Sequence, residues 1–164
     1  MTIQELLLLE FDEEMANTRR MLERVPEASL SGKPHDKSMT LGRLGSHIAD
    51  LPNRCVSIVS TDVYVRPAHA TPFVAGSAKE LLEHFVKASG DACGALRGLR
   101  DEQLAGRWTL KFGDRTMVEL PRAMALRRVF LDHLIHHRGQ LSVYLRMLNV
   151  PIPGMYGPSA DDAR

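Results

Sequence analysis

Three histidines of this 164-residue chain have the residue type and the spacing to bind one metal ion. His133 and His137 lie four residues apart in an apolar stretch, so on a helix their imidazoles project from nearly the same side. His47 lies far upstream on a similar stripe, between Leu44 and Leu51. Helix packing that brought the three rings together would create a three-nitrogen site with at least one open coordination position. Such a site is typical of a reactive metal centre.

The other four histidines fit this site less well. On an ideal helix, the mean direction of the apolar residues passes within a few degrees of His137 and roughly 45° from His133. His136 lies on the order of 100° away and belongs to the flank. Two of the others lie in loops, and the third lies beside the inward residues of its helix: His35, His69 and His84. Because a single histidine on an apolar face is more often a hydrogen-bonded core residue, spacing alone leaves both roles open.

The common zinc-peptidase motifs are absent. A zincin carries a glutamate directly after its first histidine as the general base, and that position is Leu134 here. The inverted motif carries a glutamate directly before its last histidine, and that position is His136. We therefore do not expect peptidase chemistry.

Four long amphipathic segments must position the three histidines. Their apolar residues recur at helical spacing over residues 3–25, 41–58, 77–99 and 121–148. Pro52 interrupts the second segment one turn after His47 and predicts a kink there. Residues 60–76 are expected to be an irregular connector.

Two further segments complete the predicted architecture. Alternating residues on either side of Gly113–Asp114 predict a hairpin over residues 107–120. Residues 150–164 are rich in proline and glycine, which predicts an extended tail. We therefore predict an all-α fold in a single domain over residues 1–164. It is a four-helix bundle with a short hairpin-like insertion before the last helix and an extended C-terminal tail.

Composition narrows the classes of function. The formal net charge is +1 and the basic residues are scattered, which argues against a nucleic-acid partner. Acidic residues interrupt the leucines of the N-terminal stretch, so we expect neither a signal peptide nor a membrane segment. Cys55 and Cys93 lie at apolar positions typical of buried free thiols, although a disulfide between them stays open. We expect a cytoplasmic protein.

Two regions of the chain resemble the DinB family. HLIHHRGQLSVYLRML at 133–148, followed by PIPGMYGPSADD at 151–162, closely resembles the family's C-terminal signature. KSMTLGRLGSH at 37–47 resembles the helix that supplies its first histidine. The resemblance implies an up-down-down-up four-helix bundle, generally a homodimer. It also implies a divalent metal, zinc or nickel in many members, held by His47, His133 and His137.

Characterised members of that family are thiol-dependent S-transferases and an isomerase. The resemblance therefore implies a metal-dependent enzyme that uses a low-molecular-weight thiol and a small-molecule substrate. Two alternatives remain: a non-catalytic metal-binding bundle and a metal-dependent hydrolase. No catalytic residue is assigned, since each polar residue near the triad on its helix also has a structural interpretation: Arg138, Gln140 and Tyr144. Trp108 either lines the site or, as we expect, fills one end of the bundle.

Overall fold

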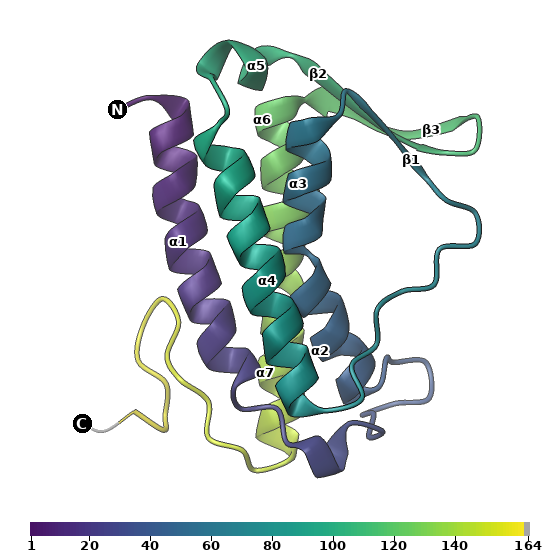
Figure 1. The fold of residues 1–164 in the computed structure, drawn as a ribbon. Coiled ribbons are helices and arrows are strands. Elements are labelled where there is room, and N and C mark those ends of the chain that lie inside the picture. Colours follow the sequence, from purple (N-terminus) through teal and green to yellow (C-terminus); the bar gives the residue numbers. More distant parts are fainter. Residues whose placement is uncertain (163–164) are drawn as a thin grey trace.

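The computed structural model describes residues 1–162, and helices make up most of the chain (Figure 1). The helices are α1 (Ile3–Leu22), the 3-10 turn η1 (Glu27–Ser29), α2 (Leu41–Asp50), α3 (Pro52–Ser60), α4 (Ala78–Arg97), α5 (Asp101–Ala105), α6 (Arg122–Ala125), the π-helix η2 (Leu126–Leu131) and α7 (Asp132–Met147). The strands are β1 (Val63–Arg66), β2 (Arg107–Phe112) and β3 (Arg115–Pro121).

Local sequence signals set where the first helices begin and end. The Thr2 hydroxyl accepts a hydrogen bond from the Glu5 backbone N–H at 3.0 Å, and the Glu5 carboxylate accepts one from the Thr2 N–H at 2.7 Å. This capping box starts α1. The break predicted at Pro52 is confirmed, because α2 ends at Asp50 and α3 begins at Pro52.

The last helical rod consists of three segments in series, whereas the sequence predicted one continuous helix from residue 121. Pro121 is the last residue of β3, and α6, η2 and α7 follow it without a gap. A π-helix holds more residues per turn than an α-helix, so side chains before and after η2 are out of helical phase. Such segments are frequent at functional sites, and this one ends at Leu131, just before His133.

The all-α four-helix-bundle assignment is wrong, because three strands form a mixed sheet at one end of the helices (Figure 1). β2 and β3 form an antiparallel hairpin whose turn places Gly113 at a φ of 56°. β1 pairs in parallel with β2, although it lies in the stretch expected to be irregular. The chain then continues as a strap (residues 67–77), which has neither helix nor strand and leads back to α4.

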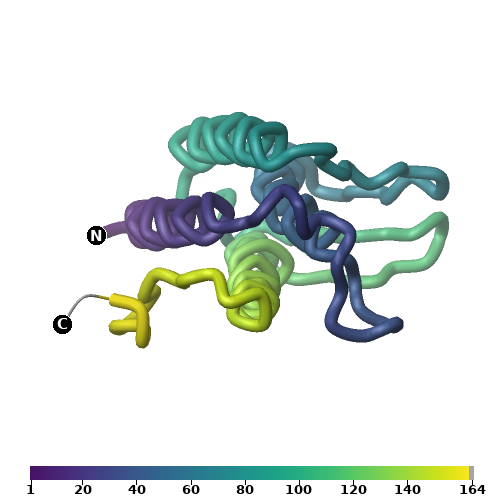
Figure 2. The backbone as a smooth tube through the Cα atoms, turned by 90° about the horizontal axis from the view of Figure 1, so that it is seen from below, coloured from purple at the N-terminus to yellow at the C-terminus, as the bar shows by residue number. Residues whose placement is uncertain are grey.

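The core lies between the long helices. Seen along the helices, α4 lies on one side and α7 on the other, with α1 and the α2–α3 pair between them (Figure 2). Large apolar side chains from all of these rods are fully buried, among them Leu44, Ile48, Leu81, Phe85, Phe130 and Leu134. Burying a side chain of this size stabilises the fold by about 1.5–3 kcal/mol.

Buried Arg122 fastens the sheet to the end of α3. Its Nε donates to the Ile58 carbonyl at 2.9 Å, and its Nη2 donates to the Thr61 carbonyl at 3.1 Å. The same guanidinium forms an ion pair with Asp62, directly before β1. These bonds satisfy carbonyls that the end of a helix leaves without partners, and they fix where β1 begins.

A buried ion pair joins α7 to α1. Arg138 is 2% exposed and Glu14 is 4% exposed, and Nη2 of Arg138 lies 2.6 Å from Oε2 of Glu14. Arg138 also donates to the Thr18 hydroxyl at 3.0 Å and to the Tyr156 hydroxyl at 2.5 Å. Tyr156 belongs to the tail after α7, so one guanidinium holds two helices and the tail together.

The tail lies beside α1 (Figure 1) and has no helix or strand through residue 162. Arg20 of α1 donates to the Gly154 carbonyl at 2.9 Å, which adds a second attachment. Positions 163–164 of the predicted tail lie outside the described residues. Within residues 1–162, no helix is both long and apolar enough to cross a membrane.

Replacing Arg138 tests the contribution of this buried pair. Arg138→Met leaves the Glu14 carboxylate buried without its partner, and we expect the free energy of unfolding in urea to fall by about 3–5 kcal/mol. Adding Glu14→Leu should recover part of this loss, because no charge then remains buried. Lys87→Met removes an exposed pair with Asp91 and serves as the control, with an expected cost below about 1 kcal/mol. Equal effects of the two single substitutions would contradict this account.

Candidate metal centre

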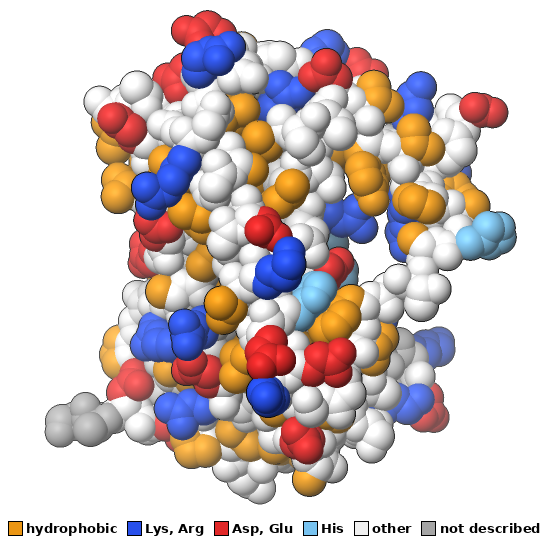
Figure 3. Space-filling view, viewed as in Figure 1, with side chains coloured by type: hydrophobic (Ala, Val, Ile, Leu, Met, Phe, Trp, Pro, Cys, Tyr) orange, Lys and Arg blue, Asp and Glu red, His pale blue; other side chains and the backbone are white. Residues whose placement is uncertain are grey.

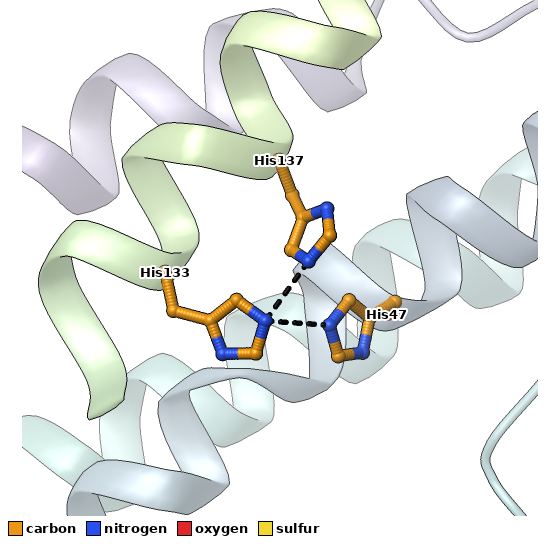
Figure 4. A group of neighbouring side chains, drawn as sticks. All are labelled: His47, His133 and His137. Atoms are coloured by element: carbon orange, nitrogen blue, oxygen red, sulfur yellow. Dashed lines mark hydrogen bonds between the residues drawn. The ribbon is translucent and has the colours of Figure 1, made fainter. Parts of the chain in front are cut away.

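Three imidazole rings from two helices converge on one point (Figure 4). His47 comes from α2, and His133 and His137 come from successive turns of α7. Nε2 of His133 lies 3.3 Å from Nε2 of His47 and 2.9 Å from Nε2 of His137. All three rings are half-buried. The structure thus brings together the three histidines that the sequence singled out.

Hydrogen bonds at the outer ring nitrogens fix how two of these rings are protonated. Nδ1 of His137 lies 2.7 Å from Oε1 of Gln140, which can only accept, so Nδ1 carries the proton. His133 makes a hydrogen bond with the backbone of Val129. This bond falls to Nδ1, because Nε2 faces the other two rings. Each neutral ring therefore presents an Nε2 lone pair to the centre of the cluster.

The surroundings favour the neutral form of all three rings. Burial, and after it repulsion from the positive charges that His137 and His133 would carry, lowers the pKa of His47 to about 4. Burial is also the main cause that lowers the pKa of His133 and of His137. Lone pairs that face one another at these distances repel unless a cation lies between them. Protons are disfavoured here, so a metal ion is the cation that suits this arrangement.

The nitrogen separations match those of a shared ion. With a metal–nitrogen bond of about 2.1 Å, two imidazole nitrogens on one ion lie about 3.0–3.4 Å apart, depending on the bond angle. The observed separations of 3.3 Å and 2.9 Å lie at or close to this range. The cluster could therefore hold a metal ion with little movement of the rings.

The histidines set aside from the sequence lie elsewhere. His136 is exposed on α7 and outside the cluster, as its angular position predicted. Nε2 of His84 donates to Oδ1 of Asp50 at 2.9 Å, and the His84 ring stacks on Phe73 with 3.7 Å between ring centres. His35 and His69 lie in loops and are exposed.

The polar neighbours of the triad divide into one that supports it and others that support the fold. Gln140 lies within hydrogen-bond distance of His137 and orients its ring. Arg138 points away from the triad into the buried pair with Glu14. The Tyr144 hydroxyl donates to the Met39 carbonyl at 3.0 Å. Trp108 is 1% exposed and fills the core, which is the role we expected.

A pocket beside the triad was missed from the sequence. It has a volume of about 410 Å³, and His47 and His133 form part of its wall. The sequence did contain a signal for this pocket. Four polar residues lie on one side of the helix, because they follow one another at spacings of four, three and four residues: Arg43, His47, Asp50 and Arg54. Of these four residues, only His47 lies on the apolar face that predicted the metal ligands.

The sequence and the fold are both similar to those of known proteins. The family model described as the DinB family matches residues 1–164. An uncharacterized protein of Bacillus subtilis (strain 168), YrdA, is 26% identical over 156 residues, which is 88% of this chain and 83% of YrdA.

Two solved structures are also similar. A DinB-like protein of Bacillus cereus ATCC 10987 superposes with a TM-score of 0.71 at 26% identity, covering 93% of this chain and 97% of that one. The DinB-like protein YjoA of Bacillus subtilis has a TM-score of 0.69 at 21% identity, covering 90% and 96% of the two chains, and shows a likeness of fold alone. Because the family model spans the whole sequence, this chain belongs to the DinB family.

Proposed function

We propose that this protein is a metal-dependent enzyme in which His47, His133 and His137 bind a divalent ion, zinc or nickel. The observation that carries the proposal is the convergence of three Nε2 atoms on one point at the wall of a pocket. Imidazole suits both metals, so the ligand set does not choose between them. The metal available in the cell decides which one is bound.

The kind of site favours catalysis over a purely structural role. Structural zinc sites are usually closed by four protein ligands, often cysteines. Here the group contains three histidines, and Cys55 and Cys93 are both free, with Cys55 buried. Three protein ligands leave room for a further molecule from the pocket. A non-catalytic metal-binding protein remains the alternative that the experiments below must exclude.

The chain's own residues would orient the metal ligands and hold the reactants. Gln140 and the Val129 backbone hold the two α7 rings with Nε2 toward the centre of the cluster, so little ordering remains when an ion binds. The ion would supply Lewis acidity, which favours the deprotonated form of a thiol or a water molecule at neutral pH. The pocket would hold the second reactant close to that position.

The proposed reaction class rests on the resemblance to the DinB family. We propose transfer to, or isomerisation with, a low-molecular-weight thiol, because the characterised members of that family are thiol-dependent enzymes. A hydrolase would use the same three histidines with water in place of the thiol. A homodimer remains part of this proposal.

Removing single histidines tests the metal site. We expect the purified, untagged protein to contain about one metal ion per chain. His47→Ala and His133→Ala should each reduce this content to near zero, as measured by atomic emission spectrometry. His136→Ala, an exposed neighbour on the same helix, should leave it unchanged. Metal content that stays at the wild-type level in both of the first two variants would rule out this triad.

Replacing Gln140 tests the orientation of His137. Gln140→Ala removes the acceptor at Nδ1, and we expect zinc to bind about tenfold more weakly in a competition titration with a chromophoric chelator. Gln140→Glu keeps an acceptor at the same place and should preserve the affinity. If both variants bind zinc equally well or equally poorly, the hydrogen bond does not tune the site.

Conjugation assays test the reaction. The metal-loaded protein should conjugate a low-molecular-weight thiol to 1-chloro-2,4-dinitrobenzene or monobromobimane at least about tenfold faster than the chelator-treated protein. Adding back zinc or nickel should restore the rate, and His136→Ala should behave like the wild type. Rates that ignore the metal across several thiols would favour the non-catalytic alternative.

A further inference from the structure

The pocket beside the triad has three walls from separate parts of the chain. One wall is the polar face of α2 and α3, the second is β1, and the third is the strap. Figure 3 shows a hollow between the helices and the strap, with Lys and Arg side chains in its wall. The lining residues are Arg43, His47, Asp50, Asn53, Arg54, Ser57, Tyr64, Arg66, Ala70, Thr71, Pro72, Phe73 and His133. Its volume of about 410 Å³ lies within the range of small-molecule sites.

Three arginines line this pocket from two of its walls. Arg43 lies one turn before His47, and Arg54 lies two turns after it on the same face. Arg66 comes from β1, where it shares the inward side of the strand with Tyr64, two residues earlier. The β1–β2 pairing holds this strand in place, since Tyr64 is opposite Leu110 and Arg66 is opposite Phe112. The sheet thus builds one charged wall of the pocket.

These three positive charges have no carboxylate partner in the described part of the chain. Other arginines of the protein do form ion pairs, as Arg122 does with Asp62 and Arg146 with Asp161. The guanidinium of Arg54 instead lies over the Tyr64 ring, 5.5 Å from its centre. That contact restrains the side chain and leaves its N–H groups free to donate to a ligand.

The one carboxylate in the pocket wall is already engaged. Oδ1 of Asp50 accepts a hydrogen bond from Asn53 at 2.9 Å and lies 2.9 Å from Nε2 of His84. His84 in turn stacks on Phe73 of the strap, so Asp50 helps to hold the strap against the helices. Three arginines and one occupied aspartate leave the pocket with an excess of positive charge.

We infer that this pocket binds a small substrate with a carboxylate or phosphate group, which Arg43, Arg54 and Arg66 hold while the rest of the molecule reaches His47 and His133. Guanidinium groups pair with both kinds of oxyanion through charge-assisted hydrogen bonds. This inference rests on the proposed function only for the reacting end of the substrate. The binding of the anionic group depends on the arginines alone.

Direct binding measurements test the inference. The full-length protein, metal-loaded and chelator-treated, is titrated with succinate, with inorganic phosphate and with uncharged succinamide, and followed by NMR of the arginine Nε–H groups. We expect succinate or phosphate to bind in both metal states and succinamide not to bind. Arg43→Gln and Arg54→Gln should each weaken binding by at least about tenfold, the effect of losing one charge-assisted hydrogen bond. Arg24→Gln, at an exposed position after α1, is the matched control.

Each result of these titrations either supports or overturns the proposed anion site. Preference for succinate over phosphate, or the reverse, identifies the anionic group, and either result supports the inference. Absence of binding, equal binding of succinamide, or unchanged affinity in both arginine variants overturns it. If the anion binds but the histidine variants keep their metal, the metal proposal fails and the anion site stands. If metal is lost in the histidine variants but no anion binds to the wild type, the anion site fails and the metal proposal stands.

Discussion

The candidate site depends on three imidazole rings whose Nε2 atoms meet at one point. The Nε2 atoms lie 3.3 Å and 2.9 Å apart in two of the three pairs, and the bonds at the outer nitrogens of His133 and His137 keep protons away from the centre. Uncompensated, this contact is repulsive, so the surrounding fold must hold the rings together. A divalent cation turns the same contact into three bonds. This balance is why we interpret the cluster as a metal centre and not as a hydrogen-bonded core.

Contacts outside the histidine cluster hold the three rings close together. The buried Arg138–Glu14 pair ties α7 to α1 and so fixes the side of α7 that His137, the preceding residue, presents to α2. The break at Pro52 separates α2, which carries His47, from α3, which carries Arg54. The sheet and the strap then enclose the space in front of the rings. Residues that hold the fold and residues of the candidate site thus lie on the same helices.

Much of the centre was predictable because it depends on short-range helical geometry. The approach of His133 to His137 and the flank position of His136 follow from the helical period. The break at Pro52 follows from the missing N–H of proline. The β2–β3 hairpin was predicted from its turn. The third strand was not predictable in the same way, since β1 has four residues and pairs with β2 across more than 40 positions of sequence. The composition of residues 126–131 does not indicate a π-helix. Side-chain directions worked out for an ideal α-helix are therefore valid only within α7. Arg43 and Arg54 were visible on one polar helical face, but their place in a pocket with Arg66 appears only when β1 and the strap lie opposite them.

X-ray absorption spectroscopy of the metal-loaded protein tests the central claim most directly, because it reports the ligands around the ion. The account predicts three imidazole nitrogens at about 2.0–2.1 Å, completed by one or more light atoms from solvent, and no sulfur. A sulfur shell at about 2.3 Å, or the scattering of a single imidazole, would contradict the assignment of His47, His133 and His137 as the metal ligands.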